Sequence, residues 1–280
     1  MTAIGKNLLS LRLGRIFSRP AMAAGFARLA SRWPVWSAGG ALVLAASLID
    51  TPATLLARDI PNHLRDVADI VTRLGITYLL VLPPAVLGLV LLLARWDRVP
   101  LLVARAWSEA GALLLYFILS VATAQLIVNL LKPVFGRARP ALFDGHGAFA
   151  FQPFTLDDMW ASFPSGHATN LGAAAMALAL IWQDRRMFIL GAGALVATTR
   201  VWVAAHYPSD VVAGFLLGCA TALFFAAAFA HARVGFFNET GSLHPCAVAM
   251  RRLRREPQSF SRAMRSLRQA LLQRIAPSKT

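Results

Sequence analysis

Long runs of apolar residues constrain the fold of this chain more than any other feature of its sequence. Six runs carry almost no charge and approach the ~20 residues that a helix needs to cross the hydrocarbon core of a bilayer. They cover residues 35–49, 75–94, 110–131, 168–183, 187–205 and 211–230. The sequence therefore predicts an all-α fold, an integral membrane bundle of six transmembrane helices.

Prolines and one carboxylate interrupt these runs. The first run can continue past Asp50 to residue 57, and the pair Pro83-Pro84 should kink the second run without ending its helix. Pro133 disfavours helix at the residue before it, so we expect the third helix to end at Lys132. The first run could instead be a signal peptide, but the leader of more than 30 residues before it is too long for one.

The charge of the chain reflects membrane topology rather than nucleic-acid binding. Only 15% of the residues are charged, against about a quarter in soluble domains, and the formal net charge is +15. No nucleic-acid recognition motif accompanies that charge. Of the 28 Lys and Arg residues, 21 lie in residues 1–34, in the gaps after the second and fourth runs, and in the tail from His231. Six spans put these segments on one side, which the positive-inside rule makes cytoplasmic.

This topology divides the chain into three parts. They are a basic cytoplasmic N-terminal segment, residues 1–34, a six-helix membrane domain, residues 35–230, and a basic cytoplasmic tail, residues 231–280. In the tail, apolar residues recur at helical spacing between arginines, at Phe260, Met264, Leu267, Leu271 and Ile275. This pattern favours an amphipathic helix on anionic lipid, with a solvated, disordered tail as the alternative.

Three polar clusters fall at the outer ends of the predicted spans. The first follows the third run and presents Lys132 and Arg139 where the chain meets water. Arginine suits bidentate contact with phosphate, and lysine acts as a point charge. Alone, the pair is also compatible with a snorkelling lysine and an interfacial arginine.

The second cluster, Pro164-Ser165-Gly166-His167, lies just before the fourth run. Ser165 is placed to cap the following helix, and free backbone N–H groups there would form an anion site with the helix dipole. Gly166 lets the backbone approach a ligand closely, and His167 can exchange a proton near neutral pH. The alternative is an ordinary helix start with an interfacial histidine.

The third cluster combines Arg200 with His206 and Asp210. An ionisable residue inside an apolar run, such as Arg200, is a functional candidate by default, although it could also snorkel. Pro208 breaks the helix and leaves His206 in a short turn, and Ser209 could cap the sixth helix. Asp210 could hold one ring nitrogen of His206 and leave the other as nucleophile or base. The alternative for this pair is a structural contact.

Together the clusters indicate phosphoryl chemistry. One side of the membrane receives three cations, a helix N-terminus, two histidines and one carboxylate. A phosphomonoester carries about −1.5 to −2 charges at pH 7. The three positive charges of the cations exceed this, and the excess can stabilise the extra negative charge of a phosphoryl-transfer transition state. No cluster of Asp, Glu, His or Cys has metal-ligand spacing, so we expect no metal, no other cofactor and a nucleophilic histidine.

The motifs resemble those of the type-2 phosphatidic acid phosphatase superfamily. That family's pattern is Lys, six residues, Arg-Pro; then Pro-Ser-Gly-His; then Ser-Arg, five residues, His, three residues, Asp. This chain matches it from Lys132 to Arg139-Pro140, from Pro164 to His167, and from Thr199-Arg200 through His206 to Asp210. Thr199 replaces the usual serine and keeps a hydroxyl. The resemblance extends over about residues 35–230 and leaves both termini uncovered.

The resemblance implies a role for each matching residue. His206 would attack phosphorus and form a phosphohistidine, and Asp210 would orient His206 and balance its charge. His167 would protonate the leaving alkoxide and later activate water. The phosphate oxygens would be held by Lys132, Arg139, Arg200, Ser165 and the backbone of Gly166.

The resemblance also implies an activity, that of a lipid phosphatase. The topology drawn from the charges puts it at the outer face of the cytoplasmic membrane, which is the periplasmic face in a Gram-negative bacterium, with both termini cytoplasmic. The substrate would be undecaprenyl pyrophosphate, phosphatidylglycerol phosphate, phosphatidic acid or a lipid A phosphate. The expected partners are this lipid and the bilayer, and no obligate protein partner is inferred. Two alternatives use the same scaffold, a non-hydrolytic lipid-binding or transport protein and a vanadate haloperoxidase. The intact His167, His206 and Asp210 disfavour the first, and the apolar composition disfavours the second.

Overall fold

The computed structural model describes residues 14–93, 101–239, 241–245, 261 and 265. The longer helices are α2 (Arg19–Ala30), α3 (Trp33–Ser47), α4 (Asp50–Arg58), α5 (Asn62–Thr72), α6 (Thr77–Leu93), α7 (Leu101–Phe135), α9 (Gly166–Ile181), α10 (Arg186–Trp202) and α11 (Pro208–His231). The short elements are η1 (Arg73–Gly75), η3 (Pro140–Leu142), α8 (Phe143–His146), η4 (Asp158–Trp160), η5 (Gln183–Arg185), β1 (Phe236–Glu239) and β2 (Ser242–Pro245). The predicted amphipathic helix of the tail lies outside the described residues, apart from Ser261 and Arg265.

Helices form over all six predicted runs, although fewer of them have the length and composition of a complete span. Within the described residues, two are long and apolar enough to cross a bilayer, Val103–Phe135 and Pro208–His231. Two bent pairs raise the number to four if each pair is one span: α3 with α4, bent by 52°, and α5 and η1 with α6, bent by 42°. The fold is therefore a mostly helical bundle, and the count of six spans stays a prediction.

The second bent pair does not bend at its prolines. Pro83 and Pro84 lie inside α6, which continues through both of them, as the sequence predicts. The bend lies instead where η1 ends at Gly75 and α6 begins at Thr77. Asn170 on α9 donates hydrogen bonds to the carbonyl of Gly75 and the hydroxyl of Thr77, each at 2.9 Å. A neighbouring helix thus satisfies the backbone that the break exposes.

The prediction that the third helix ends at Lys132 is wrong. α7 continues through Pro133 to Phe135, so that this proline lies in the last turn of the helix. Neighbouring helices allow a membrane helix to tolerate such a proline. The helix ends instead at Gly136, whose φ is +58° and whose N–H donates to the carbonyl of Lys132 at 2.9 Å. A Cβ at Gly136 would lie 1.8 Å from the carbonyl oxygen of Gln152, so only glycine fits there.

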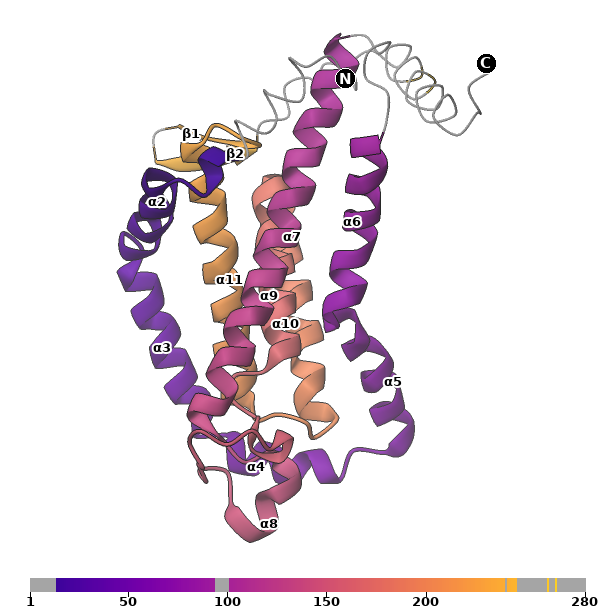
Figure 1. The fold of residues 1–280 in the computed structure, drawn as a ribbon. Helices are drawn as coiled ribbons and strands as arrows, with labels where there is room; N and C mark the ends of the chain where they lie inside the picture. Colours follow the sequence, from indigo (N-terminus) through magenta and orange to yellow (C-terminus); the bar gives the residue numbers. More distant parts are fainter. Residues whose placement is uncertain (1–13, 94–100, 240, 246–260, 262–264, 266–280) are drawn as a thin grey trace.

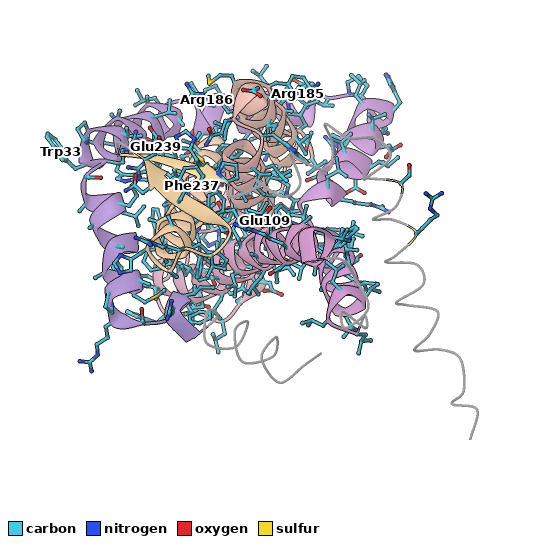
Figure 2. The ribbon with its side chains drawn as sticks, turned by 90° about the horizontal axis from the view of Figure 1, so that it is seen from above. Trp33, Glu109, Arg185, Arg186, Phe237 and Glu239 are labelled. Atoms are coloured by element: carbon cyan, nitrogen blue, oxygen red, sulfur yellow. The ribbon has the colours of Figure 1, made fainter. Side chains whose placement is uncertain are left out.

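The helices lie side by side, with the predicted motifs gathered at one end of the bundle (Figure 1). The end of α7, the start of α9, the end of α10 and the start of α11 all lie at the lower end of this view, near α4 and α8. The hairpin of β1 and β2 lies at the upper end. Seen from above, Arg185 and Arg186 lie on that upper face together with Phe237 and Glu239 of the hairpin (Figure 2).

Large apolar side chains cover the outer surface of the bundle. Leu44 on α3, Leu82 on α6, Leu126 on α7 and Leu195 on α10 are each more than half exposed. Large apolar side chains exposed on four separate helices indicate contact with another apolar phase. Together with a hydrophobic content of 57%, this surface identifies a membrane protein.

One two-stranded hairpin corrects the all-α prediction. β1 and β2 pair antiparallel, from Phe236 opposite Pro245 to Glu239 opposite Ser242. The ring of Phe236 packs edge to face on Tyr116 of α7, with ring centroids 4.7 Å apart. The hairpin therefore closes the core at the end of the bundle opposite the motifs.

Close packing of α9 against α11 positions two of the three clusters. A Cβ on Gly172 would lie 2.1 Å from a backbone carbonyl oxygen of α11, and one on Gly218 would lie 2.0 Å from the carbonyl oxygen of Thr169. A Cβ on Gly214 would lie 2.4 Å from the carbonyl oxygen of Ser165. Small residues at helical spacing allow membrane helices to approach this closely. The contact holds the starts of both helices together.

We expect Gly218→Ala to lower the thermal midpoint of the detergent-solubilised protein, because overpacking a tight contact costs about 1–3 kcal/mol. Gly88→Ala is the matched control, since Gly88 lies inside α6 and a Cβ there would meet nothing within 4 Å. That substitution should be neutral or slightly stabilising. Thermal unfolding followed by circular dichroism compares the two, and equal midpoints would contradict a contact that requires glycine.

Candidate active site

The three clusters meet at the lower end of the bundle in Figure 1. The backbone N–H of Ser165 donates to the carbonyl of Asp210 at 3.1 Å, which joins the starts of α9 and α11. The backbone N–H of His206 donates to the carbonyl of Arg200 at 3.2 Å, which folds the chain back after α10. The second and third clusters therefore share one site.

Ser165 occupies the N-cap position of α9, but its side chain makes no capping hydrogen bond. The prediction that its hydroxyl caps the helix is therefore wrong. The hydroxyl is buried and has no hydrogen-bond partner within the described residues, and the same holds for Nε of Arg200. Buried polar groups are normally hydrogen-bonded. Both atoms are thus free to bind an anion at the start of α9.

The cations of the first and third clusters lie beside the second cluster. Lys132 Nζ lies 3.8 Å from the position that a Cβ on Gly166 would take. Charge–charge interactions connect Lys132 with Arg139 and with Arg200. In the described part of the chain, none of the three forms an ion pair with a carboxylate. Asp158 and Asp210 act on Lys132, and Asp69 acts on Arg200, from beyond ion-pair distance. Three cations held together without a direct ion pair favour an anion between them.

His206 lies in the turn between α10 and α11 and is 3% exposed. Its Nδ1 lies 3.7 Å from Oδ2 of Asp210, close enough for a charge interaction and too far for a good hydrogen bond. Burial lowers the pKa of His206 to about 4; Asp210 offsets part of this effect, while Arg200 and Arg139 lower the pKa further. The ring is therefore neutral at pH 7, as a nucleophile requires.

His167 lies in the first turn of α9 and is half-buried. Charge–charge interactions connect it with Arg200, His206, Lys132 and Arg139. The second predicted histidine therefore belongs to the same group of side chains as the first. All eight residues that the sequence singled out are brought to this end of the bundle.

Sequence reasoning missed a buried network behind Asp210. Arg137 Nη1 lies 2.5 Å from Oδ1 of Asp210, and its Nη2 lies 2.7 Å from Oδ2 of Asp50. Ser162 Oγ donates to Oδ2 of Asp210 at 2.6 Å, and Ser209 Oγ donates to Oδ2 of Asp50 at 2.6 Å. Every member of this network is buried.

The sequence carried one signal for this network. Asp50 is a carboxylate at the end of an apolar run, where an ionisable residue is a functional candidate. Ser209 does not cap the sixth helix; instead the N–H of Tyr207 donates to Oδ2 of Asp210 at 3.0 Å. Asp210 thus both closes the start of α11 and faces His206.

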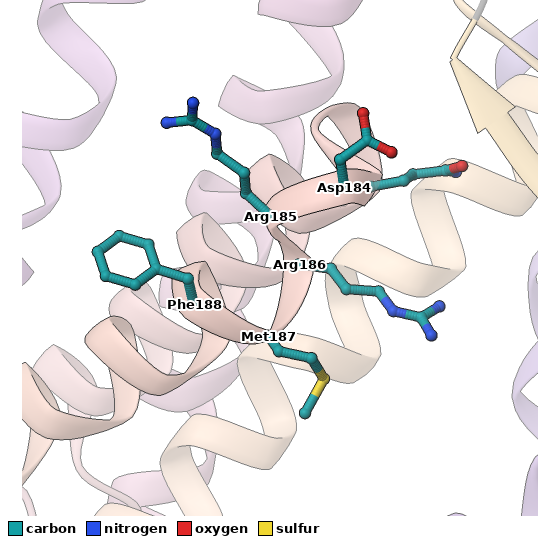
Figure 3. Close-up of a pocket in the computed structure, with 6 residues that line it drawn as sticks. Asp184, Arg185, Arg186, Met187 and Phe188 are labelled. Carbon is teal, nitrogen blue, oxygen red and sulfur yellow. The ribbon is translucent and has the colours of Figure 1, made fainter.

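A surface hollow at the opposite end of the bundle is not part of this site. It lies around the turn between α9 and α10 and is lined by Gln183, Asp184, Arg185, Arg186, Met187 and Phe188. Figure 3 shows Arg185 and Arg186 pointing in different directions, so these cations do not converge on one anion. Within the described residues, no group of three His, Cys, Asp or Glu side chains could hold a metal ion.

Comparisons with known proteins agree with the motifs. The model of the PAP2 superfamily matches residues 113–233, which contain all three clusters. A lipid A 1-phosphatase of Rhizobium johnstonii is 34% identical over 195 residues, 68% of this chain and 77% of that protein. An undecaprenyl-diphosphatase of Sulfolobus acidocaldarius is 32% identical over 143 residues, 47% of this chain and 65% of that protein.

One solved structure is also similar, that of the first transmembrane PAP2 type phosphatidylglycerolphosphate phosphatase from Bacillus subtilis. It is 24% identical in sequence, has a TM-score of 0.41, and the match covers 74% of this chain and 92% of that chain. The family model and the Rhizobium relative, most of whose length is matched, carry the assignment. The chain therefore belongs to the PAP2 superfamily and is a hydrolase of its lipid-phosphatase class.

Proposed function

We propose that this phosphatase hydrolyses a phosphate or pyrophosphate ester of a membrane lipid through a phosphohistidine formed on His206. The observation that carries the proposal is the gathering of Lys132, Arg139 and Arg200 around the two histidines without ion-pair partners in the described chain. The unpartnered hydroxyl of Ser165 and Nε of Arg200 support it. A phosphoryl group has the charge and the acceptor oxygens to satisfy all of them.

The first step of the proposed reaction belongs to His206. Its Nδ1 faces Asp210 at 3.7 Å, so Nε2 is the atom that would attack phosphorus. The Nε2–P bond forms while the bond from phosphorus to the lipid oxygen breaks. The ring keeps its proton on Nδ1 and becomes cationic, and the carboxylate of Asp210 stabilises that cation.

The second step returns the enzyme to its starting state. Burial and the neighbouring cations lower the pKa of His167 to about 4 in the free enzyme, and the negative charge of a bound phosphate opposes those cations and favours the protonated ring. We propose that His167, protonated beside the bound phosphate, gives its proton to the lipid oxygen that departs in the first step and then takes one from the water that attacks phosphorus. That attack breaks the P–Nε2 bond, releases inorganic phosphate and leaves His206 neutral. The cations and the backbone N–H groups at the start of α9 would hold the equatorial oxygens through both steps.

For the substrate we propose the 1-phosphate of lipid A ahead of the other candidate lipids. Two lipid A 1-phosphatases from Rhizobium species support this choice, because each is 34% identical and matched over 77% or 76% of its length. Undecaprenyl pyrophosphate is the second candidate, supported by shorter matches to two undecaprenyl-diphosphatases. In either lipid the phosphate lies at the polar end, which suits a site at one end of an apolar bundle.

A lipid panel in detergent micelles tests the proposed reaction. Wild type should release phosphate from lipid A and form an acid-labile phosphoenzyme, and His206→Ala should lose turnover by about 10³-fold or more because the nucleophile is gone. His63→Ala is the control, since His63 is an exposed histidine on α5. Equal phosphate release from wild type and His206→Ala would refute the route. Lipid binding by wild type without any turnover would favour the non-hydrolytic alternative.

The pH dependence of turnover follows from the lowered pKa of His206. Because this pKa is about 4, the ring stays neutral as the pH falls through the ordinary histidine range. We expect kcat/KM, which reports the groups of the free enzyme, to hold below pH ~6.5 and to fall only as the pH approaches ~4. An acid limb centred near pH ~6.5 would contradict the assignment of His206 as the buried nucleophile.

Folding stability has its own pH dependence, which the same experiment must monitor. The unfolded chain protonates His206 near pH ~6.5, before the folded protein does. Stability therefore declines as the pH falls from that value toward the folded pKa of about 4. Thermal midpoints at each pH separate this loss of folded protein from a loss of turnover.

We also propose the six-span topology, with the site at the periplasmic face of the inner membrane and both termini in the cytoplasm. The support is the confinement of 21 of 28 cations to four segments, and the position of Arg185 and Arg186 at the end opposite the site (Figure 2). This topology keeps the division into residues 1–34, 35–230 and 231–280.

Cysteine labelling tests that sidedness. Asp59→Cys and Arg185→Cys, each made in a chain in which Cys219 and Cys246 are replaced by serine, put one exposed thiol at either end of the bundle. In intact spheroplasts, a membrane-impermeant maleimide should label Asp59→Cys, and should label Arg185→Cys only after the membrane is permeabilised. The reverse pattern would invert the topology.

A further inference from the structure

We infer that Asp50, acting through Arg137, keeps the buried cluster behind His206 at one net negative charge, which stabilises the cation formed on His206 during phosphoryl transfer. Asp50 and Arg137 are positioning residues in this account, because both act through Asp210. The inference rests on the proposed phosphohistidine route.

The cluster is one buried chain of charged contacts. Arg137 is 3% exposed, and Asp50 and Asp210 are fully buried. Arg137 Nη1 donates to Oδ1 of Asp210 at 2.5 Å, and Nη2 donates to Oδ2 of Asp50 at 2.7 Å. Its Nε and Nη2 also donate to the carbonyl of Ala148, at 3.1 and 2.8 Å, and its guanidinium carbon lies 4.4 Å from the ring centroid of Tyr207. These contacts hold the guanidinium in one orientation.

Arg137 determines which oxygen of Asp210 faces the histidine. Because Oδ1 accepts from Arg137, Oδ2 is left to face the turn before α11. There it accepts from Ser162 Oγ at 2.6 Å and from the N–H of Tyr207 at 3.0 Å, and it lies 3.7 Å from Nδ1 of His206. The carboxylate therefore has no freedom to turn its charge away from the ring.

Asp50 sets the net charge of the cluster. Arg137 and Asp210 alone would cancel, and His206 would lie against a neutral pair. Asp50 shares the same guanidinium, so the cluster retains one negative charge. Burying that excess is costly, and only part of the cost is offset by the start of α11, where the N–H of Ser209 donates to Oδ1 of Asp50 at 3.0 Å. A cation on His206 supplies the missing counterpart.

Among the described residues, Asp210 is the carboxylate that interacts with His206. The largest charge interactions of His206 are with Asp210 on α11, Arg200 on α10, His167 on α9 and Arg139 after α7. Asp210 is the one anion in this described set. If the negative charge behind His206 is lost, none of these neighbouring groups replaces it to stabilise a cation on the imidazole ring.

Asp50→Asn tests the inference, because it removes the charge and keeps the size of the side chain. We expect kcat to fall about 10- to 100-fold with KM nearly unchanged, the effect of a unit charge several ångströms away at an effective dielectric constant of about 20. The acid limb of kcat/KM should also move to lower pH, because protonated His206 loses a stabilising charge. Unchanged kcat, or a lower thermal midpoint with the acid limb in place, would overturn the inference.

Asp144→Asn is the matched control. Asp144 is an exposed carboxylate at the same end of the bundle, and it pairs with Arg58 at 2.7 Å. Its loss should leave kcat, the acid limb and the thermal midpoint as in wild type. A wild type without turnover or phosphoenzyme would refute the proposed function itself, whereas an active wild type matched by Asp50→Asn overturns only the role of Asp50.

A double variant distinguishes charge from shape. Asp50→Asn with Arg137→Gln removes one carboxylate and one cation, and so restores a single negative charge. We expect its kcat to exceed the product of the losses in the two single variants. A purely structural role predicts that product or a lower kcat, and either result would overturn the inference.

Discussion

The pairing of Arg137 with two buried carboxylates ties together parts of the chain that are far apart in sequence. Asp50 begins α4, Arg137 follows α7, and Asp210 lies in the first turn of α11. In a region of low dielectric constant, a member of this cluster left without its partner would cost several kcal/mol. The fold must therefore bring all three to one place. That place is directly behind His206, so one constraint organises this end of the bundle and sets the surroundings of the histidine.

Helix packing fixes the rest of the site. Gly172, Gly214 and Gly218 let α9 and α11 touch backbone to backbone, and the N–H of Ser165 then reaches the carbonyl of Asp210 at 3.1 Å. The anion-binding start of one helix and the carboxylate of the other are thus held by rigid elements rather than by loops. Groups held in this way need little reorganisation when a substrate arrives. The close contact of α9 with α11 at these glycines therefore determines how accurately the groups of the site are positioned.

The sequence predicted the helical runs and the grouping of the motif residues because each stands out locally. Apolar runs are long and uncharged, and charges beside them are few. Prediction failed where the local sequence allows several arrangements and tertiary packing decides which of them forms. Ser165 occupies a cap position, yet its hydroxyl caps nothing; Pro133 should end a helix, yet α7 continues through it. Arg137 and Arg139 are chemically identical and two residues apart, but only Arg137 pairs with buried carboxylates. The motif spacing singles out Arg139, but no local pattern shows that Arg137 pairs with Asp50 and Asp210.

The surroundings of His206 have an electrical polarity that suits the proposed reaction. Arg139 and Arg200 interact with the ring as cations, while the cluster of Asp50, Arg137 and Asp210 bears a net negative charge. During attack on phosphorus, negative charge spreads over the phosphoryl oxygens while positive charge appears on the ring. Both changes are favoured by this polarity, and burial makes each effect larger than it would be in water. If the pair behind the ring were neutral, the site would stabilise only the negative charge on the phosphoryl oxygens. The excess negative charge is costly to bury, but it also stabilises the positive charge that forms on His206.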